Sequence, residues 1–337
     1  MRRIATAGSL ALLAMMFLLH PGQARAATSC SASVGGISFG TVDPSGTTDV
    51  SAVVTLSCDS SGLQVLGTVY VNACLLLGTG SGGSSLSPRT LRNGFGDTIE
   101  YNVYHGSGYV NVWGNTPATW LPLQLSIPVI LIGGSGSTSA TVQARIPSQP
   151  GLAAGTYSSS FDGIHTELRY RYDEPLALIG SSMPASCESG GDGGATGIPF
   201  AMFTVTASVA DQCVISTATD LDFGTVPGLI SAPIDQTSSV TLACTRRTPW
   251  HLALDDGQNA AGGVRRMRLG SSSSHVAYEL YRDPGRTQRW GGAIGADTAA
   301  GTGEGTPQTV TVYGRVPAPQ AVPAGQYQDV VRVTITY

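Results

Sequence analysis

Six cysteines are the residues of this 337-residue chain whose spacing points most directly to a chemistry. All of them follow residue 26, at Cys30, Cys58, Cys74, Cys187, Cys213 and Cys244. An even number of cysteines in an exported chain predicts three disulfides. The sequence contains no Cys-x-x-Cys motif and no cluster of cysteine with histidine. We therefore expect neither a redox motif nor a metal site.

Other residues that could support catalysis or nucleotide binding are scattered. The segment Gly78–Gly83 fits the pattern G-x-G-x-x-G, but no helical pattern follows it, and 44 glycines make chance matches common. Asp255-Asp256 leads into Gly257, which is typical of a turn. The exported histidines follow no serine elbow and no metal spacing; they are His105, His165, His251 and His275. We expect no enzymatic activity and no cofactor.

The N-terminus has the pattern of an export signal. Arg2 and Arg3 precede an apolar run from Leu10 to Leu19, and Ala24-Arg25-Ala26 supplies the small residues that a signal peptidase recognises. The apolar run is shorter than the roughly 20 residues that a membrane-spanning helix needs. We therefore predict a signal peptide, residues 1–26, that is cleaved after Ala26.

The composition excludes several classes of protein. Only 12% of the residues are charged, the sequence contains no lysine, and the net charge is −4. A nucleic-acid-binding protein or a coiled coil would carry far more charge. Hydrophobic residues make up 42% of the chain, which is enough for a packed core. A β-rich chain with many turns fits these values.

An internal repeat divides the chain into two copies of one domain. Landmarks recur in the same order, and several have identical spacings. The matched segments are Phe39-Gly40-Thr41-Val42 with Phe223-Gly224-Thr225-Val226, Val54-Thr55-Leu56-Ser57-Cys58 with Val240-Thr241-Leu242-Ala243-Cys244, Tyr101, Tyr104 and Trp113-Gly114 with Tyr278, Tyr281 and Trp290-Gly291, and Ala154-Gly155-Thr156-Tyr157 with Ala324-Gly325-Gln326-Tyr327. We predict two domains, residues 27–210 and 211–337.

Each copy has short strand patterns separated by Gly, Pro, Ser and Asn, which predicts an all-β fold of two tandem antiparallel sandwiches. The matched cysteines predict one disulfide per copy between the first two strands, Cys30 with Cys58 and Cys213 with Cys244. Each bridge would close a loop of about 30 residues and contribute about 3–4 kcal/mol.

The copies differ at their C-terminal ends. In the first copy, Phe200–Val209 alternates apolar and polar residues, as a final strand requires. The second copy stops at Tyr337, where the preceding strand ends, so we expect it to lack its final strand. Burial of the missing side chains would contribute on the order of 10 kcal/mol to the stability of the domain. We expect a strand-acceptor groove, filled by a partner's strand, and lined by Val331, Val333, Ile335 and Tyr337.

The N-terminal end of the exported chain predicts a position in a fibre. About three residues separate the predicted cleavage site from Cys30. A subunit in the middle of a donor-strand polymer needs a longer extension to insert into its neighbour. We therefore expect this subunit to accept a strand without donating one, and to terminate a fibre.

Taken as a set, these motifs resemble the spore coat U domain family, the pilin-like module of archaic chaperone–usher secretion systems. The resemblance rests on Cys, Phe-Gly-Thr-Val, Val-Thr-Leu-x-Cys, Tyr-x-x-Tyr with Trp-Gly, Ala-Gly-x-Tyr and the final Val331–Tyr337 segment. It implies pilin-like, immunoglobulin-like sandwiches and similarity to a pilus tip adhesin. It further implies export through the periplasm, a periplasmic chaperone, an outer-membrane usher and a next pilin subunit as partners, and a place at the extracellular pilus tip.

Comparing the copies shows where the first one is elaborated. Three stretches are longer in it, after Cys58, after Trp113 and between residues 173 and 199, and we expect them to lie at the pole away from the second copy. Their apolar side chains either complete the core or form an exposed patch; these are Leu63, Val65, Leu66, Trp120, Leu121, Leu123, Leu125, Leu176, Leu178, Ile179 and Met183. By elimination, Cys74 pairs with Cys187 and holds the third stretch. The hypothesis is adhesion and biofilm formation through apolar loops that bind abiotic or cell surfaces.

Two other functions remain open from the sequence. A structural spore or cyst coat protein could be built from the same modules. A carbohydrate-binding or hydrolytic exoprotein is a third interpretation, although Tyr101, Tyr104 and Trp113 recur in the second copy and are better explained as shared core.

Overall fold

A computed structural model describes residues 27–61, 66–175, 180–226 and 228–337 of the chain. The predicted signal peptide lies outside these residues. Within them the fold is all-β, as predicted, and the one helical element is the 3₁₀ turn η1 (Pro117–Thr119). None of the helices in the described part is long and apolar enough to cross a membrane.

The strands up to residue 209 form two facing sheets, here called the first sandwich. One sheet has the order β1-β3-β9-β6-β5-β10-β13-β2, with β7 paired to β6, and the other has the order β12-β11-β4-β8. The strands are β1 (Ala27–Val34), β2 (Ile37–Thr41), β3 (Thr48–Ser61), β4 (Gly67–Leu77), β5 (Arg89–Arg92), β6 (Thr98–His105), β7 (Asn111–Val112), β8 (Leu121–Val129), β9 (Gly133–Ile146), β10 (Gly155–Phe161), β11 (Thr166–Asp173), β12 (Gly193–Ile198) and β13 (Phe203–Val209).

The strands from residue 213 onward form the second sandwich. Its sheets have the orders β14-β16-β21-β19-β18-β23, β20-β17-β24 and β15-β22. The strands are β14 (Cys213–Ala218), β15 (Leu229–Ile230), β16 (Ile234–Cys244), β17 (Pro249–Leu254), β18 (Arg265–Leu269), β19 (His275–Tyr281), β20 (Ala299–Thr302), β21 (Pro307–Val316), β22 (Gln320–Ala321), β23 (Tyr327–Gln328) and β24 (Val333–Thr336).

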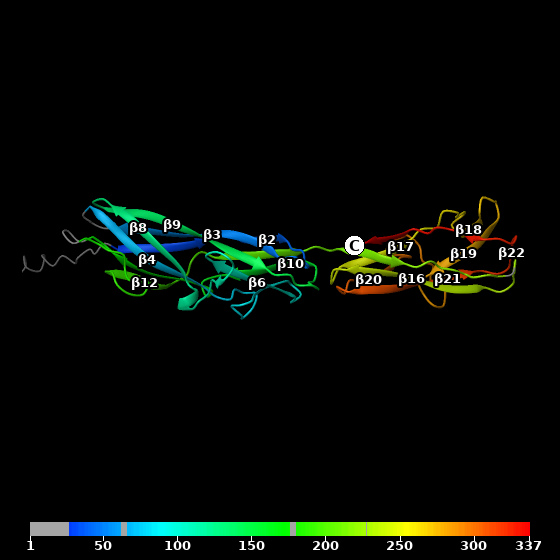
Figure 1. Cartoon of the computed structure of the whole chain (residues 1–337), viewed down its shortest axis with the longest axis horizontal. Helices are drawn as coiled ribbons and strands as arrows, with labels where there is room; N and C mark the ends of the chain where they lie inside the picture. Colours follow the sequence, from blue (N-terminus) through cyan, green and yellow to red (C-terminus); the bar gives the residue numbers. More distant parts are fainter. Residues whose placement is uncertain (1–26, 62–65, 176–179, 227) are drawn as a thin grey trace, which may run out of the picture.

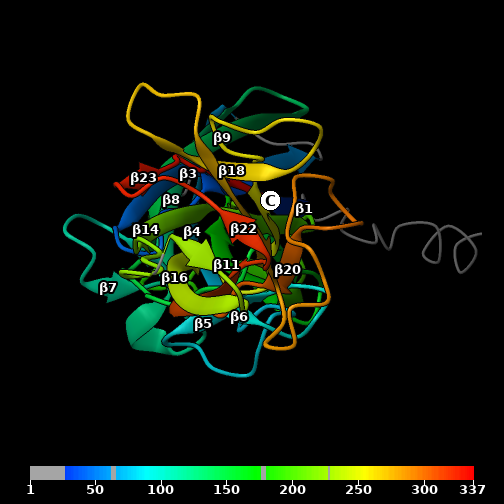
Figure 2. The ribbon, with the colours of Figure 1, turned by 90° about the vertical axis from the view of Figure 1, so that its right-hand side faces the viewer.

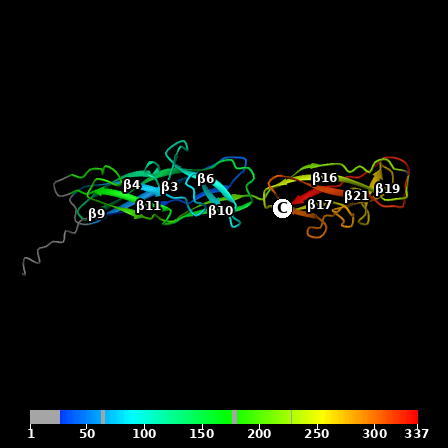
Figure 3. The same cartoon turned by 90° about the horizontal axis from the view of Figure 1, so that it is seen from below.

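The two sandwiches lie end to end in an elongated molecule (Figures 1 and 3). Seen along the long axis, the second sandwich stands in front of the first (Figure 2). Each has its own apolar core, one built around residues such as Leu56 and Val205 and the other around Leu242 and Leu252. The ends of β4, β8 and β9 form the pole that faces away from the second sandwich (Figure 1).

The matched cysteines form matched bridges. Cys30 is bonded to Cys58 and Cys213 to Cys244, and both pairs have a Cα–Cα distance of 4.1 Å. Each joins directly opposite residues of adjacent antiparallel strands, β1 with β3 and β14 with β16. Both predicted pairings are confirmed.

A buried arginine recurs in the two cores. Arg89 and Arg265 are both fully buried. Arg89 Nε donates to the Gly78 carbonyl over 2.8 Å, and Arg265 Nε donates to the Asp255 carbonyl over 2.9 Å. Each also donates through Nη2 to the carbonyl of the conserved-spacing tryptophan, Trp113 or Trp290. The guanidinium groups thus satisfy the Gly78 and Asp255 carbonyls, which directly follow β4 and β17, and join them to the tryptophan backbone.

Longer strands account for much of the extra sequence in the first sandwich. β3 has 14 residues against 11 in β16, and β4 has 11 against 6 in β17. β8 has 9 residues against 4 in β20, and β9 has 14 against 10 in β21. The additional residues extend the sandwich toward its far pole, where β8 and β9 are joined by only three residues.

A buried carboxylate connects the two sandwiches. The Asp97 side chain is only 8% exposed and accepts from Arg246 Nη2 over 2.8 Å and from Arg247 Nε over 2.6 Å. The Arg247 guanidinium also stacks 4.9 Å from the ring centroid of Phe95. Hydrogen bonds from Arg247 and then from Asn93 hold the pKa of Asp97 below its usual 3.8. The junction is therefore a specific contact in addition to a linker.

Candidate functional sites: an apolar tip and an open groove

The connection between β8 and β9 is a very short turn at the far pole. Gly133 has a φ of +116°, and a Cβ there would lie 2.2 Å from the Ser60 carbonyl oxygen. A Cβ on Gly134 would lie 2.2 Å from the Pro128 carbonyl oxygen. Because only glycine tolerates such approaches, this pair allows the two strands to meet at the end of the sandwich.

Three consecutive large apolar residues occupy that turn. Ile130 is 61% exposed, Leu131 is 64% exposed and Ile132 is 79% exposed. Leu131 has a φ of +59°, in the left-handed region that leucine rarely adopts. Strained backbone of this kind is commonly kept at functional sites. We call Ile130, Leu131 and Ile132, together with Leu66, the apolar tip.

Leu66 belongs to the same pole because of the strand register. Gly67, which follows it, lies opposite Val129, and Ser61 lies opposite Gly133. The start of β4 and the end of β8 are therefore neighbours. Leu66 is 71% exposed, so it adds a fourth apolar side chain beside the turn.

A third segment, residues 180–192, is fixed along β4 near this pole. Ser181 Oγ donates to the Thr68 carbonyl, and Asn72 Nδ2 donates to the Pro184 carbonyl over 3.1 Å. Met183 in this segment is half-buried. The segment therefore borders the tip without covering it.

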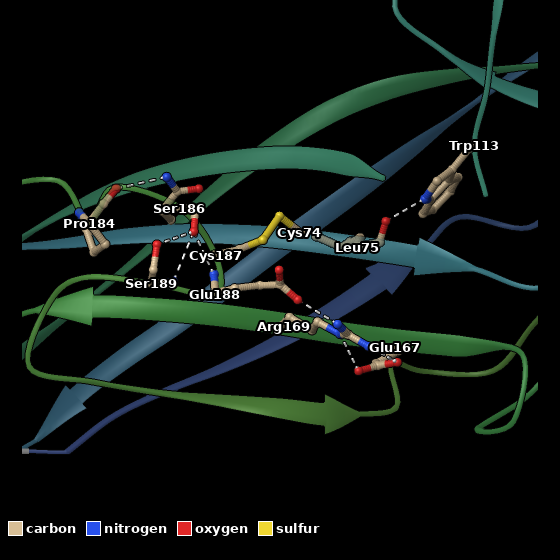
Figure 4. The surroundings of a disulfide bond; sticks show 11 residues. Cys74, Leu75, Trp113, Glu167, Arg169, Pro184, Ser186, Cys187, Glu188 and Ser189 are labelled. Atoms are coloured by element: carbon tan, nitrogen blue, oxygen red, sulfur yellow. Dashed lines mark hydrogen bonds and ion pairs between the residues drawn. A yellow bond between two sulfur atoms is a disulfide. The ribbon is translucent and has the colours of Figure 1, made fainter. Parts of the chain in front are cut away.

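The Cys74–Cys187 disulfide anchors this segment, which confirms the predicted pairing (Figure 4). The bridge packs with Leu76 and Trp120 in a small apolar cluster that is separate from the main core. Arg169 closes the cluster, with its guanidinium 5.1 Å from the ring centroid of Trp120. Arg169 is itself held by Glu167 at 2.6 Å and by Glu188 at 2.7 Å (Figure 4).

The structure corrects part of the predicted surface patch. Trp120, Leu121, Leu123 and Leu125 are each at most 9% exposed, so the expectation that they form an exposed patch is wrong. The reason is that the last three lie in β8, where alternate side chains point into the core. Five further patch residues lie outside the described residues: Leu63, Val65, Leu176, Leu178 and Ile179. Ile130, Leu131 and Ile132 were missed, although three consecutive apolar residues before Gly-Gly break the alternation of a strand.

The second candidate site is the unpaired side of the second sandwich. In the first sandwich, β13 pairs with β10 on one side and with β2 on the other. In the second, β23 corresponds to β10, and within the described part of the chain it pairs with β18 alone. Residues 219–226, which correspond to the region of β2, form no strand. The place that β13 fills in the first sandwich is thus open in the second.

Matched side chains show the consequence of this opening. Phe39 is 5% exposed and Val42 is 3% exposed, whereas Phe223 is half-buried and Val226 is 37% exposed. Phe39 lies in β2, which pairs with β13, and the Val42 amide donates to the Ser208 carbonyl of β13. The comparison indicates apolar surface that a further strand could cover.

The predicted groove residues lie along β24 and the segment before it. Val331, Val333 and Ile335 are half-buried, and Tyr337 is 55% exposed. In the first sandwich the residues at the positions of Ile335 and Tyr337 are Leu168 and Tyr170, which are 0% and 4% exposed. We call the surface formed by six residues of the second sandwich the open groove; these are Val331, Val333, Ile335, Tyr337, Leu221 and Phe223.

Neither site has the composition of a catalytic or metal centre. Among the residues that the structure describes, no group of three or more His, Cys, Asp or Glu side chains could hold a metal ion. The tip is apolar, and the six residues that define the groove carry no charged side chain. Both arrangements suit contact with apolar surface or with a β-strand.

Comparison with known proteins finds one family that matches two regions of the chain. The family model described as Spore Coat Protein U domain matches residues 17–162 and again residues 200–334. Protein U of Myxococcus xanthus is 34% identical over 145 residues, which cover 39% of this chain and 80% of that protein.

Two solved structures also align with most of the chain. A chain of the CsuC–CsuE chaperone–tip adhesion subunit pre-assembly complex from archaic chaperone–usher Csu pili of Acinetobacter baumannii is 17% identical, with a TM-score of 0.45, and the match covers 92% of this chain and 100% of that one. The CupB6 tip adhesin from Pseudomonas aeruginosa is 13% identical, with a TM-score of 0.38, and the match covers 92% and 95%. These scores are too low to support an argument about function. Because the family model matches both of its halves, the chain belongs to the Spore Coat Protein U domain family.

Proposed function

We propose that the chain is the tip subunit of a secreted chaperone–usher pilus and mediates adhesion and biofilm formation. Residues 27–210 would form the adhesin domain, and residues 211–337 would join the fibre by accepting a strand. The partners would be a periplasmic chaperone, an outer-membrane usher and the next pilin subunit. The route would lead through the periplasm to the cell surface.

The exposed apolar tip is the observation that carries the proposal. Three successive residues, Ile130 to Ile132, are each more than half exposed at the extreme end of the molecule. A soluble protein gains nothing from such exposure unless the surface binds something. The tight turn also fixes these side chains in advance, so that little conformational entropy is lost on contact.

The chemistry of the tip favours an apolar or abiotic surface as the target. The four side chains of the tip carry no charge and no hydrogen-bonding group. Attachment would then be driven by the hydrophobic effect, which depends on the apolar area removed from water. We expect attachment that survives high salt and is weakened on hydrophilic surfaces.

Replacing Ile130, Leu131 and Ile132 together with Ser tests the adhesive role. We expect pili of normal number that no longer attach to polystyrene, measured by cell adherence and by electron microscopy. The matched control replaces Val53, Val110 and Ile164 with Ser, since these are also exposed apolar residues of the first sandwich and lie away from the tip. Undiminished attachment by the tip variant would refute the proposal.

The open groove supports the second part of the proposal. Filling it with a partner strand would restore the burial that Phe39 and Val42 have beside β13 in the first sandwich. Co-expression of the full chain with a candidate chaperone should give a stable complex that is lost when residues 211–337 are deleted. A chain that stays monomeric, with both sandwiches equally stable without a chaperone, would contradict strand acceptance.

A structural coat protein is the second candidate. The 34% identity to Protein U over 145 residues and the family model described as Spore Coat Protein U domain support this alternative. Immunogold labelling separates the two functions, because a tip subunit places label at fibre ends whereas a coat protein places it evenly over the cell or spore surface.

A further inference from the structure

Asp329 occupies the place in the second sandwich that Ser159 occupies in the first. The pairing of neighbouring strands shows the equivalence. The residue before Ser159 lies opposite Arg92 of β5, and the residue before Asp329 lies opposite Arg268 of β18.

The contacts of the two side chains agree with this equivalence. The Gly82 amide donates to Ser159 Oγ over 3.1 Å, and the Asn259 amide donates to Asp329 Oδ1 over 3.2 Å. Asp329 receives two more bonds, from Asn259 Nδ2 over 2.9 Å and from the Tyr278 hydroxyl over 2.7 Å. Burial, and then the bond to Asp329, raises the pKa of Tyr278, so that its hydroxyl stays protonated and donates.

The first sandwich shows which residue of an inserted strand lies beside this position. Val205 of β13 is directly opposite Ser159, and it is fully buried between that residue and Ile37 of β2. By the matched Phe-Gly-Thr-Val motif, Leu221 corresponds to Ile37. An inserted strand would therefore place one side chain between Leu221 and the carboxylate of Asp329.

A side chain at that position would contact an apolar residue on one side and a carboxylate on the other. An ionised carboxylate offers about four acceptor sites, and three donors reach Asp329 from the described part of the chain. A strand that fills the groove would exclude water from the fourth site. A purely apolar side chain would leave the charge poorly solvated, whereas a hydroxyl beside it would donate the missing bond.

Resting on the proposed strand acceptance, we propose that the open groove selects a donor strand with Thr or Ser opposite Asp329. The methyl group of Thr would face Leu221 and its hydroxyl would face the carboxylate. The other inward positions of the donor would be apolar, as Phe203, Ala207 and Val209 are in β13. Asp329 thus acts as a specificity residue in an otherwise apolar groove.

Two peptides test this selectivity on the full chain. One has the sequence of residues 198–209 of this protein, and the other carries Val205→Thr, which changes a methyl to a hydroxyl at nearly constant shape. Fluorescence polarisation of labelled peptide measures the dissociation constants. We expect the Thr peptide to bind about tenfold more tightly to the wild type, as a hydrogen bond to a charged group allows. In Asp329→Ser the preference should fall below about twofold.

Controls separate this inference from the proposed function. Asp329→Asn keeps the shape of the side chain and should also lose the preference, while Gln328→Ser, at an exposed neighbour, should keep it. A peptide with Thr206→Val, at an outward position, should bind like its parent. Binding of neither peptide would refute strand acceptance itself. Equal binding of both to the wild type, or a preference that survives in both Asp329 variants, would overturn the selectivity while leaving strand acceptance intact.

Discussion

The two sandwiches share one scaffold but expose apolar surface at different places. The first completes itself with β13, and its extended strands carry the exposed Ile130–Ile132 turn at the far pole. The second has short strands and leaves the counterpart of β13 open. On the proposed function, one fold would serve two kinds of contact. Closure within the chain would leave the first sandwich free to present a tip, whereas the second would depend on a strand from outside.

Reopening the first sandwich is the strongest way to test this comparison. Val205→Asp places a carboxylate at a fully buried position of β13. We expect the free energy of unfolding of the first sandwich to fall by more than about 4 kcal/mol, because a buried charge without a partner is very costly. The change is measured by denaturant unfolding that is followed by the fluorescence of the tryptophans in the first sandwich.

Thr206→Asp is the matched control for this substitution. Thr206 is the next residue of β13 and its side chain is exposed, so the expected loss is below about 1 kcal/mol. Similar effects for the two variants would mean that β13 does not close the core of the first sandwich.

Removing the Cys74–Cys187 bridge probes a feature that the second sandwich lacks. The bridge spans a sequence separation of 113 residues, and we expect the Cys74→Ser, Cys187→Ser double variant to lose about 2–4 kcal/mol. The loss should appear in the unfolding of the first sandwich alone. The same treatment of Cys213 and Cys244 should affect the second sandwich alone. A shared loss in both transitions would show that the sandwiches unfold as one unit.

Much of this comparison could be predicted from the sequence. The repeat of Phe-Gly-Thr-Val and of Val-Thr-Leu-x-Cys predicts two equivalent sandwiches and one disulfide in each, and the structure contains both disulfides. The alternation in Phe200–Val209 predicts the extra strand of the first copy, and the structure confirms it as β13 over Phe203–Val209. Period-two alternation is a local property and therefore survives without knowledge of the fold.

The tip was harder to place because exposure depends on where a strand ends. Leu121, Leu123 and Leu125 are separated by single residues that face outward, and this alternation is that of β8, so they complete the core instead of forming the exposed patch. The turn that follows depends on a contact between Gly134 and Pro128, which only the pairing of β8 with its neighbours determines. The junction at Asp97 was not predicted either, since its partners lie about 150 residues further along the chain.

The junction at Asp97 offers a milder test, of how firmly the two sandwiches are held together. Asp97→Asn removes the charge that pairs with Arg246 and Arg247, and we expect about 1–2 kcal/mol of coupling to be lost, since both arginines are partly exposed to water. Distances between spin labels on the two sandwiches should broaden. An unchanged distance distribution would mean that the linker alone sets the arrangement.

The pH dependence of the junction has a defined sign. The pKa of Asp97 is lowered from 3.8 in the folded chain, chiefly by the hydrogen bond from Arg247. The stabilisation is therefore complete above about pH 4 and is lost as the pH falls through the lowered folded value. The wild type should broaden its distance distribution on acidification in that range, whereas Asp97→Asn should not respond.

The smallest effect on stability is expected where the effect on function is largest. Leu131→Gly removes an exposed side chain from a residue with a φ of +59°, a conformation that costs leucine roughly 1 kcal/mol and glycine almost nothing. The variant should be unchanged or up to about 1 kcal/mol more stable, yet attach less well to an apolar surface. Leu131→Asn, which tolerates the same backbone with a polar side chain, should lose attachment as well. Ile294→Ser removes comparable exposed surface from the second sandwich and should leave attachment unchanged. Because stability and adhesion are expected to move in opposite directions at Leu131, a loss of attachment there could not be attributed to unfolding.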